Sequence, residues 1–332
     1  MLDLGTNNCR LMVALPRRGT SFSVVDSFSK IVRLGEGIAT TGRISDAAQD
    51  RAMDALKNCA EIIARWDAIG VRCVTTEACR LAENGPAFIE RVRRETGLRL
   101  EVIDPAEEAR LALKGCQNLV DPAAKHAVLF DIGGGSTELC FLEVRPGYDD
   151  RADVKLLKTA TMPFGVVRLS EGVAEGCFSP EHFQSARDGT AEAVRACMPQ
   201  GFGVDPGGAD HLIGTSGTST SLAAMQLGLK RYRRRDVDGS WLTGEDIVSL
   251  SERLDAMGFE GRSEQPAIGE GRADLIMPGC AILLGVLDAV PTRRIRVADR
   301  GLREGLVMEL IEAGQGKRQP RRERVSSAGH DR

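Results

Sequence analysis

Short stretches of alternating apolar and polar positions occur twice in this chain, in the same order. Residues 2–16, LDLGTNNCRLMVALP, form an apolar stretch that ends in Asp3, a glycine-containing turn and a second stretch of roughly alternating pattern. Residues 130–144, FDIGGGSTELCFLEV, repeat this plan around Asp131. Alternation with a period of two predicts strands, so each half is expected to begin with a β-hairpin. The repetition predicts two domains with one ancestral plan.

Strand and helix patterns alternate after each hairpin. In the first half we expect a strand, a helix with Ser45 as its N-cap, a strand leading into a helix, a second helix and a strand. These elements correspond to residues 22–34, 45–69, 70–82, 86–96 and 98–103. In the second half we expect a strand, a helix, a strand running into a loop and a helix, a strand and a closing helix. These correspond to residues 154–164, 179–198, 210–221, 293–299 and 301–313. This order predicts an α/β fold with helices on the faces of a sheet.

The stretch NLVDPAAKH, residues 118–126, is the expected junction between the two halves. We therefore predict domains at residues 1–120 and 121–313. Residues 314–332 are polar and basic and lack large apolar side chains, which predicts a disordered tail. Only two residues precede Asp3, which leaves the position of the natural start open.

Composition excludes several classes of partner. A net charge of −3 does not favour nucleic acid or a membrane surface as a partner. No apolar run reaches the ~18 residues of a membrane span, and no leader sequence is visible. Nine cysteines without a C-x-x-C pair predict reduced, mostly buried thiols in a cytoplasmic protein. The four histidines form no H-x-x-x-H pair, so any metal is expected to have oxygen ligands.

The glycine run Gly133, Gly134 and Gly135 raises the question of what approaches this backbone so closely. Successive backbone N–H groups without side chains form a nest that binds anions, phosphate above all. Ser136 follows directly and can add a hydroxyl donor. Taken alone, the run is equally compatible with an ordinary glycine-rich hairpin.

Acidic residues on both sides of this run predict a metal ion. Asp131 precedes the glycines and Glu138 follows them. A carboxylate beside a phosphate repels it unless a cation lies between the two, so we expect Mg²⁺, with Asp131 and Glu138 as its candidate ligands.

Two further loops resemble the glycine run in composition. The first hairpin carries Thr6, Asn7 and Asn8 at its turn, and the stretch GTSGTSTS at 214–221 follows a predicted strand and opens a predicted helix, whose N–H groups and dipole suit an anion. The candidate phosphate contacts in the latter are Gly214, Ser216, Gly217 and Thr218. Three separate loops suit a ligand with several phosphates, and neither a Walker A loop nor a G-x-G-x-x-G fingerprint is present.

Glu108 is the candidate for activating water. In IDPAEEARLALKG, Asp104 suits the N-cap of a helix and Pro105 its first position, and Glu107 completes a capping box. Glu108 is left free to face the cleft and to orient and deprotonate a water molecule. The structural alternative is a first-turn acid that favours the helix dipole.

Arginines near the predicted cleft are candidates for contacting phosphate. Arg80 follows a strand and could make a forked contact with a phosphate oxygen. The alternative role for Arg80 is structural, in an ion pair with Glu77 or Glu83. Arg303 is a weaker candidate, and the basic cluster at 230–236 fits either attraction of a polyanion or a solvated loop.

In this order the motifs resemble the Ppx/GppA family of exopolyphosphatases and guanosine pentaphosphate phosphatases, within the actin-like ATPase and sugar-kinase superfamily. The resemblance covers residues 2–312 through DLGTNN, TTEACR, EEARLAL, DIGGGSTEL, GTSGT, PGCAILLGVLDA and GLREG. It implies two ribonuclease-H-like domains with the active site in the cleft between them. It also implies Glu108 as the catalytic acid, Arg80 as a phosphate contact and Asp131 and Glu138 as magnesium-associated acids. Relatives commonly dimerise, so a homodimer is an assembly to test.

Two features depart from the family pattern. The first loop reads Thr6-Asn7-Asn8 where the family usually has Ser-Asn-Ser, so one hydroxyl donor is lost at Asn8. The chain also lacks the C-terminal helical domain with which longer members hold long polyphosphate, which puts processive action on long chains in question.

The resemblance leaves several functions to be distinguished. Mg²⁺-dependent release of orthophosphate from the end of inorganic polyphosphate is the expectation. The alternatives are removal of the terminal phosphate of guanosine pentaphosphate (pppGpp), a sugar-kinase-like phosphotransferase, and a non-catalytic sensor of polyphosphate or alarmone.

Overall fold

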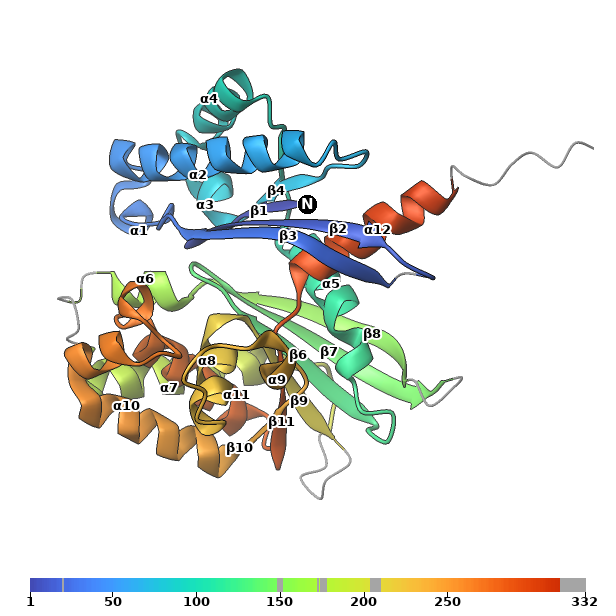
Figure 1. The fold of residues 1–332 in the computed structure, drawn as a ribbon. Coiled ribbons are helices and arrows are strands. Elements are labelled where there is room, and N and C mark those ends of the chain that lie inside the picture. The colour runs from blue at the N-terminus through green and yellow to red at the C-terminus, as the bar shows by residue number, and fades with distance from the viewer. Residues whose placement is uncertain (20, 148–151, 172, 174–177, 204–209, 317–332) are drawn as a thin grey trace, which may run out of the picture.

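The computed structural model describes residues 1–332 except 20, 148–151, 172, 174–177, 204–209 and 317–332. The chain forms two lobes, each built on one β-sheet, with helices stacked against the sheets (Figure 1).

The first sheet has five strands in the order β3-β2-β1-β4-β5. The strands are β1 (Leu2–Leu4), β2 (Asn8–Pro16), β3 (Phe22–Ile31), β4 (Cys73–Thr75) and β5 (Leu100–Val102). β1, β2 and β3 are antiparallel, whereas β1 pairs with β4, and β4 with β5, in parallel. The predicted hairpin at 2–16 is therefore confirmed.

The second sheet has six strands in the order β10-β11-β9-β6-β7-β8. The strands are β6 (His126–Ile132), β7 (Thr137–Pro146), β8 (Ala152–Met162), β9 (His211–Thr215), β10 (Trp241–Thr243) and β11 (Arg294–Ala298). β6, β7 and β8 are antiparallel, and β6 pairs with β9, and β9 with β11, in parallel. Except for the edge strand β10, this is the topology of the first sheet, so the duplication inferred from the sequence is confirmed.

Helices cover the faces of both sheets. In the first half they are α1 (Ile38–Thr41), α2 (Asp46–Arg65), α3 (Glu77–Leu81), α4 (Gly85–Thr96) and α5 (Pro105–Cys116). In the second half they are α6 (Val166–Ser170), α7 (Pro180–Cys197), α8 (Ser216–Gln226), α9 (Arg234–Val237), α10 (Gly244–Glu264), α11 (Ile276–Ala289) and α12 (Leu302–Gly316). The Ser45 hydroxyl accepts a hydrogen bond from the Ala48 N–H at the start of α2, as predicted.

Each sheet has its own apolar core. Strand residues such as Leu4 and Leu11 pack with α2 in the first half, and Phe130 and Phe141 pack with α8 and α11 in the second. Every cysteine in the described part of the chain is free, and all but Cys197 are buried, in agreement with the expectation of reduced thiols. None of the described helices is long and apolar enough to cross a lipid bilayer.

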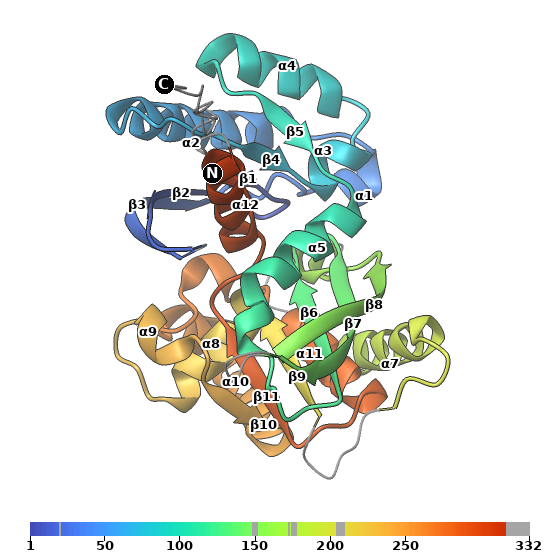
Figure 2. The ribbon, with the colours of Figure 1, turned by 90° about the vertical axis from the view of Figure 1, so that its right-hand side faces the viewer.

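Helices α5 and α12 join the two halves. Figure 2 shows α5 running between the sheets with α12 beside it. Leu306 and Val307 of α12 pack with Met12 and Val74 of the first sheet, although α12 follows the second sheet in the chain. The division into domains between residues 120 and 121 stays a prediction. It assigns α12 to the second domain, although α12 packs on the first sheet.

A network of ion pairs on the surface also connects α5 with α12. Glu309 of α12 lies 2.8 Å from Arg72 and 2.6 Å from Arg110 of α5, and Lys114 of α5 lies 2.5 Å from Glu312. Helix α12 extends to Gly316, three residues into the segment predicted as a tail, and the rest of that segment lies outside the described residues.

The crossing of α5 and α12 depends on glycine. A Cβ on Gly305 would overlap the Leu111 carbonyl oxygen of α5, and one on Gly115 would overlap the Gly301 carbonyl oxygen. The two helix backbones therefore lie closer together than any side chain would allow, which fixes where α5 presents its first turn.

Gly305→Ala is expected to destabilise the protein by about 1–3 kcal/mol, because the added methyl group forces the helices apart. Gly189→Ala is the matched control, since Gly189 lies inside α7 with nothing within 4 Å of its Cβ position. That variant should be neutral or more stable by up to ~1 kcal/mol. Chemical denaturation measures both, and equal stability of the two variants would contradict the proposed contact.

Candidate functional site

The tips of the two duplicated hairpins touch each other between the sheets. A Cβ on Gly134 would lie 3.1 Å from the Thr6 Cβ and 3.3 Å from the Asn7 backbone nitrogen. Gly134 therefore has to be small because the first hairpin packs on it. The three loop residues Thr6, Asn7 and Asn8 and the glycine run thus come together, as the sequence suggested.

The glycine run offers fewer free amides than its composition implies. The Gly133 N–H donates to the Ser136 carbonyl at 2.9 Å, which closes the hairpin. The carbonyls of Gly133 and Gly134 accept from the Val166 and Val167 N–H groups at the start of α6, at 3.0 and 2.8 Å. The amides of Gly134 and Gly135 have no partner within the described part of the chain, so they are the ones left for an anion.

Polar side-chain atoms of the first loop also lack hydrogen-bond partners among the described residues. Val32 and Arg33 donate their N–H groups to the Asn7 carbonyl, which holds the loop in place. The Asn7 and Asn8 side-chain oxygens are buried and find no partner among the described residues. Each of these amide side chains can still donate through its nitrogen to a ligand.

The third stretch, GTSGTSTS, follows a strand and opens a helix as we expected, but no separate loop lies between the two. Helix α8 begins at Ser216, directly after β9, so Ser216, Gly217 and Thr218 form its first turn. A Cβ on Gly214 would lie 2.5 Å from the Phe130 ring, so this glycine makes room for the core.

The hydroxyl groups of this turn have structural contacts. Ser216 Oγ donates to the Ile132 carbonyl, and Thr218 packs against Gly279 of α11. Gly217 faces Arg272, whose Nη1 would lie 3.5 Å from a Cβ there. This pairing of a helix N-terminus with an arginine is the part of the stretch best suited to an anion.

Four acidic residues converge beside the glycine run. Asp131 lies next to the last residue of β6, directly opposite Glu138 of β7. Asp3 occupies the equivalent place in the first hairpin, and Glu108 lies in the first turn of α5. The Ser136 hydroxyl donates to Glu138 Oε1 at 2.6 Å. Glu108 Oε2 is enclosed and has no partner among the described residues.

Burial and mutual repulsion raise the pKa values of these acids. Burial raises the pKa of Glu108 well above its ordinary value, and the negative charges of Glu138, Asp131 and Asp3 raise it further. Burial likewise raises the pKa of Asp131 to about 6 and that of Glu138 to about 8. Groups whose environments favour the neutral form in this way are typical of functional sites.

Glu107 has a different environment from Glu108. Its backbone N–H donates to the Asp104 side chain at 2.8 Å, so the predicted N-cap is confirmed. The return bond of the capping box is absent, since the Glu107 carboxylate instead pairs with Arg110 at 2.7 Å and Arg72 at 3.3 Å. These contacts lower the pKa of Glu107, the hydrogen bond from Arg110 contributing most.

Arg80 lies among the acids of the cleft. Its Nη1 donates to the Ile103 carbonyl at 2.7 Å, and its positive charge lowers the pKa values of Glu77, Glu108 and Glu138. Glu83 pairs with Arg43 at 3.1 Å, so the alternative ion pair between Arg80 and Glu83 is wrong.

Arg10 and Glu77 were not singled out from the sequence. Arg10 lies opposite Asp3 in the first hairpin, exactly where the duplication puts Glu138 opposite Asp131 in the second. The charges of Arg10 and Arg303 lower the pKa values of both Asp3 and Asp131. Comparing the two hairpins position by position would have indicated Arg10.

The donor set fits a hard divalent cation. Asp131 and Glu138 face each other across one strand pair, and the nearest arginines lower but do not reverse the rise in their pKa values. Among the described residues no group of three or more acidic, histidine or cysteine side chains forms a complete metal site. One or two carboxylates completed by phosphate oxygens and water are what Mg²⁺ normally uses, so these two residues suit it.

Two duplicated α/β domains with an acidic cleft between their hairpins define an actin-like, ribonuclease-H-like protein. Residues 13–313 match the Ppx/GppA phosphatase family. Exopolyphosphatase 2 of Mycobacterium tuberculosis is 28% identical over 321 residues, covering 93% of this chain and 97% of the relative. The crystal structure of the Aquifex aeolicus Ppx/GppA family member has a TM-score of 0.74 at 28% identity, covering 94% of this chain and 97% of that one. An exopolyphosphatase from Cytophaga hutchinsonii has a TM-score of 0.78 at 26% identity, covering 94% and 97%.

This chain belongs to the Ppx/GppA phosphatase family. It is therefore a phosphatase, a hydrolase in class, and the resemblance inferred from its motifs is confirmed.

Glu108→Gln is expected to stabilise the protein at neutral pH. An acid with a raised pKa in the folded state destabilises the fold once it ionises, so the penalty is absent below the ordinary glutamate pKa of ~4.3 and grows as pH rises. We expect a gain of about 1–3 kcal/mol at pH 8, which disappears near pH 4. Chemical denaturation across this range measures it.

Glu107→Gln is the matched control, one position away. Its pKa is lowered in the folded state, so its carboxylate stabilises above the ordinary glutamate pKa and that contribution is lost as pH falls. This variant should lose stability at neutral pH. Loss of stability in Glu108→Gln at pH 8 would show that the Glu108 carboxylate is satisfied in the fold.

Proposed function

We propose that the protein is an exopolyphosphatase that releases terminal orthophosphate from inorganic polyphosphate with Mg²⁺ as its cofactor. The observation that carries this proposal is the enclosed, unpartnered Glu108 Oε2, whose ionisation is affected by Asp131 and Glu138 on either side of the glycine run. Relatives that span nearly the whole chain carry the name exopolyphosphatase, which supports polyphosphate as the substrate.

A linear chain of phosphates suits the charges around the cleft. The amides of Gly134 and Gly135 can hold the oxygens of the last phosphate. Arg10, Arg303 and Arg272 lie close enough together that the charges of the latter two lower the pKa of Arg10. A polyanion placed beside them relieves that repulsion, so we assign the next phosphates of the chain to these arginines.

Glu108 orients the attacking water and accepts its proton. Burial and the neighbouring acids raise the pKa of Glu108, which makes its carboxylate a stronger base than that of an exposed glutamate. Arg80 and the glycine amides stabilise the charge that develops on the phosphate oxygens. Asp131 and Glu138 would hold Mg²⁺, which supplies charge neutralisation when bound.

Glu108→Ala is expected to lower phosphate release from polyphosphate by 10²–10⁴-fold, the usual contribution of a general base. Binding of polyphosphate should change only a few-fold, because the amides and arginines remain. Glu107→Ala is the control, since its side chain pairs with Arg110 and Arg72 away from the cleft. Hydrolysis at the wild-type rate in Glu108→Ala would remove Glu108 from the mechanism.

The same assay decides the substrate. Rates on short polyphosphate, long polyphosphate and pppGpp are compared with and without Mg²⁺, and polyphosphate should be the faster substrate. Equal rates on polyphosphate and pppGpp would leave the choice of polyphosphate without support. Tight binding without turnover of either compound would indicate the sensor function instead.

Mg²⁺ is expected to raise the temperature of unfolding of the wild-type protein, because it relieves repulsion between Asp131 and Glu138. Asp131→Asn should reduce this shift by at least half. Glu143→Gln is the control on β7, since Glu143 pairs with Arg145 and Lys155 at the surface. Differential scanning calorimetry measures the shift, and an unchanged shift in Asp131→Asn would exclude Asp131 as a ligand.

A further inference from the structure

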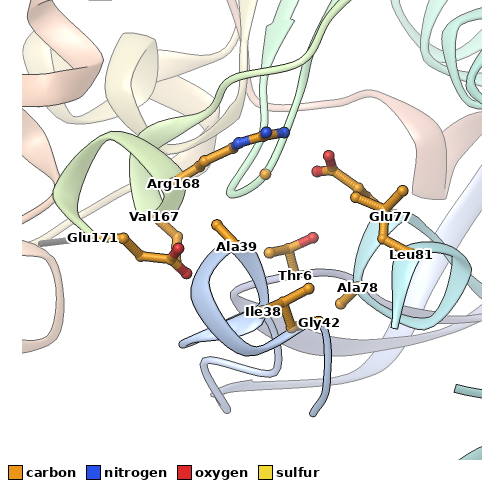
Figure 3. Close-up of a pocket in the computed structure, with 12 residues that line it drawn as sticks. Thr6, Ile38, Ala39, Gly42, Glu77, Ala78, Leu81, Val167, Arg168 and Glu171 are labelled. Atoms are coloured by element: carbon orange, nitrogen blue, oxygen red, sulfur yellow. The ribbon is translucent and has the colours of Figure 1, made fainter. Parts of the chain in front are cut away.

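A pocket lies beside the glycine run, between the two halves of the molecule. It has a volume of about 150 Å³ and is lined by parts of α1, α3 and α6 together with Thr6 and Gly135 (Figure 3). Its polar lining includes two carboxylates, Glu77 and Glu171, and one cation, Arg168. Neither Glu108 nor the three acidic residues around it line this pocket.

Both carboxylates have an oxygen that the fold leaves unsatisfied. Glu77 is 8% exposed, and its Oε2 is buried without a partner among the described residues. Glu171 Oε1 accepts a hydrogen bond from the Gly37 N–H across the domain junction at 3.0 Å. Its Oε2, like that of Glu77, is buried and has no partner among the described residues. Figure 3 shows the two carboxylates approaching the pocket from opposite sides.

The pocket begins where the glycine run ends. A Cβ on Gly135 would overlap Glu77 Oε2 and would lie 3.3 Å from Thr6 Oγ1. Glu77 therefore lies directly against the loop that we assign to the last phosphate of the substrate. Its negative charge also reaches the acids of the site, because it raises the pKa of Glu138.

Charge rather than size keeps a phosphate out of this pocket. A water molecule occupies about 30 Å³ in the liquid, so the cavity has room for a further phosphate group. Two carboxylates face one guanidinium there, and burial raises the pKa of Glu77 although the charges of Arg80 and Arg168 oppose that rise. A phosphate that entered would bring negative charge next to two unpaired carboxylate oxygens of low solvent exposure, which is strongly unfavourable.

We propose that Glu77 and Glu171 form an anionic end wall that stops the polyphosphate chain at Gly135. This inference rests on the proposed exopolyphosphatase function. The wall sets the register of the chain, so only the terminal phosphoanhydride bond reaches Glu108. Glu77 and Glu171 are thus specificity-determining residues that take no part in the chemical step.

The two registers give different products. In the normal register water adds to the terminal phosphorus, the bond from that phosphorus to the bridging oxygen breaks, and orthophosphate leaves. If the chain advances by one unit into the pocket, water adds to the second phosphorus, the bond from that phosphorus to the oxygen bridging it to the third phosphorus breaks, and pyrophosphate leaves instead. Each event consumes one water molecule, and the shortened chain keeps the bridging oxygen.

The test is the identity of the first product. Wild-type protein, Glu77→Gln and the double variant Glu77→Gln/Glu171→Gln are given polyphosphate of defined length, and early products are measured by ³¹P NMR and ion chromatography. Wild type should release orthophosphate alone. The variants should release pyrophosphate in at least one event in ten, more often in the double variant. A separate assay with pyrophosphate as the only substrate measures how fast each protein hydrolyses it. That rate is used to correct the measured yield of pyrophosphate.

Arg168→Gln is the matched control, because it changes the same pocket but removes the opposite charge. It should release orthophosphate alone. Pyrophosphate from Arg168→Gln as well would show that any disturbance of the pocket shifts the register, and would overturn the electrostatic wall. Orthophosphate alone from the glutamine variants, with wild-type KM, would overturn it too. A wild-type protein that releases no phosphate from polyphosphate would instead reject the function on which the inference rests.

Discussion

Repulsion among the carboxylates of the cleft is the constraint on which the structure of the site depends. Asp3, Glu108, Asp131 and Glu138 lie close enough together for each to affect the ionisation of a neighbour. Burial already disfavours their charged forms, and like charges at short range disfavour them further. Such a cluster persists only where cations offset it and where rigid elements prevent the side chains from moving apart.

The duplicated fold supplies both conditions. The ends of two hairpins fix Asp3 and Asp131, and the crossing of α5 over α12 fixes Glu108. The two hairpins are not electrically equivalent, however. The position opposite Asp3 carries Arg10, whereas the matching position opposite Asp131 carries Glu138. The first hairpin therefore carries an acid opposite a base, whereas the second carries two acids opposite each other, so the duplicated hairpins form one asymmetric site.

Sequence patterns predicted the parts of this site that depend on neighbouring residues. The hairpins, the N-cap at Asp104 and the acids flanking the glycine run could all be inferred from local spacing. Patterns failed where one segment depends on another. The stretch at 214–221 opens a helix, as its pattern predicts, but the packing of Gly214 on Phe130 and the bond from Ser216 to Ile132 accompany a helix that begins directly after the strand, without the loop that the composition predicts. Similarly, Glu107 makes no return capping bond, since its carboxylate pairs with Arg110 and also with Arg72, which is distant in the sequence.

The sequence by itself determined the family, the duplicated α/β plan and the residue types available for phosphate and metal chemistry, because these depend on periodicity and on motifs of a few residues. Only the tertiary structure decided which charges face each other. It brought Arg10, Glu77 and Arg168 to the cleft, left Glu108 Oε2 without a partner, and put α12 against the first sheet. The physical reason is that Coulomb energy and burial depend on distance in space, and residues far apart in the chain meet only after the two sheets have packed.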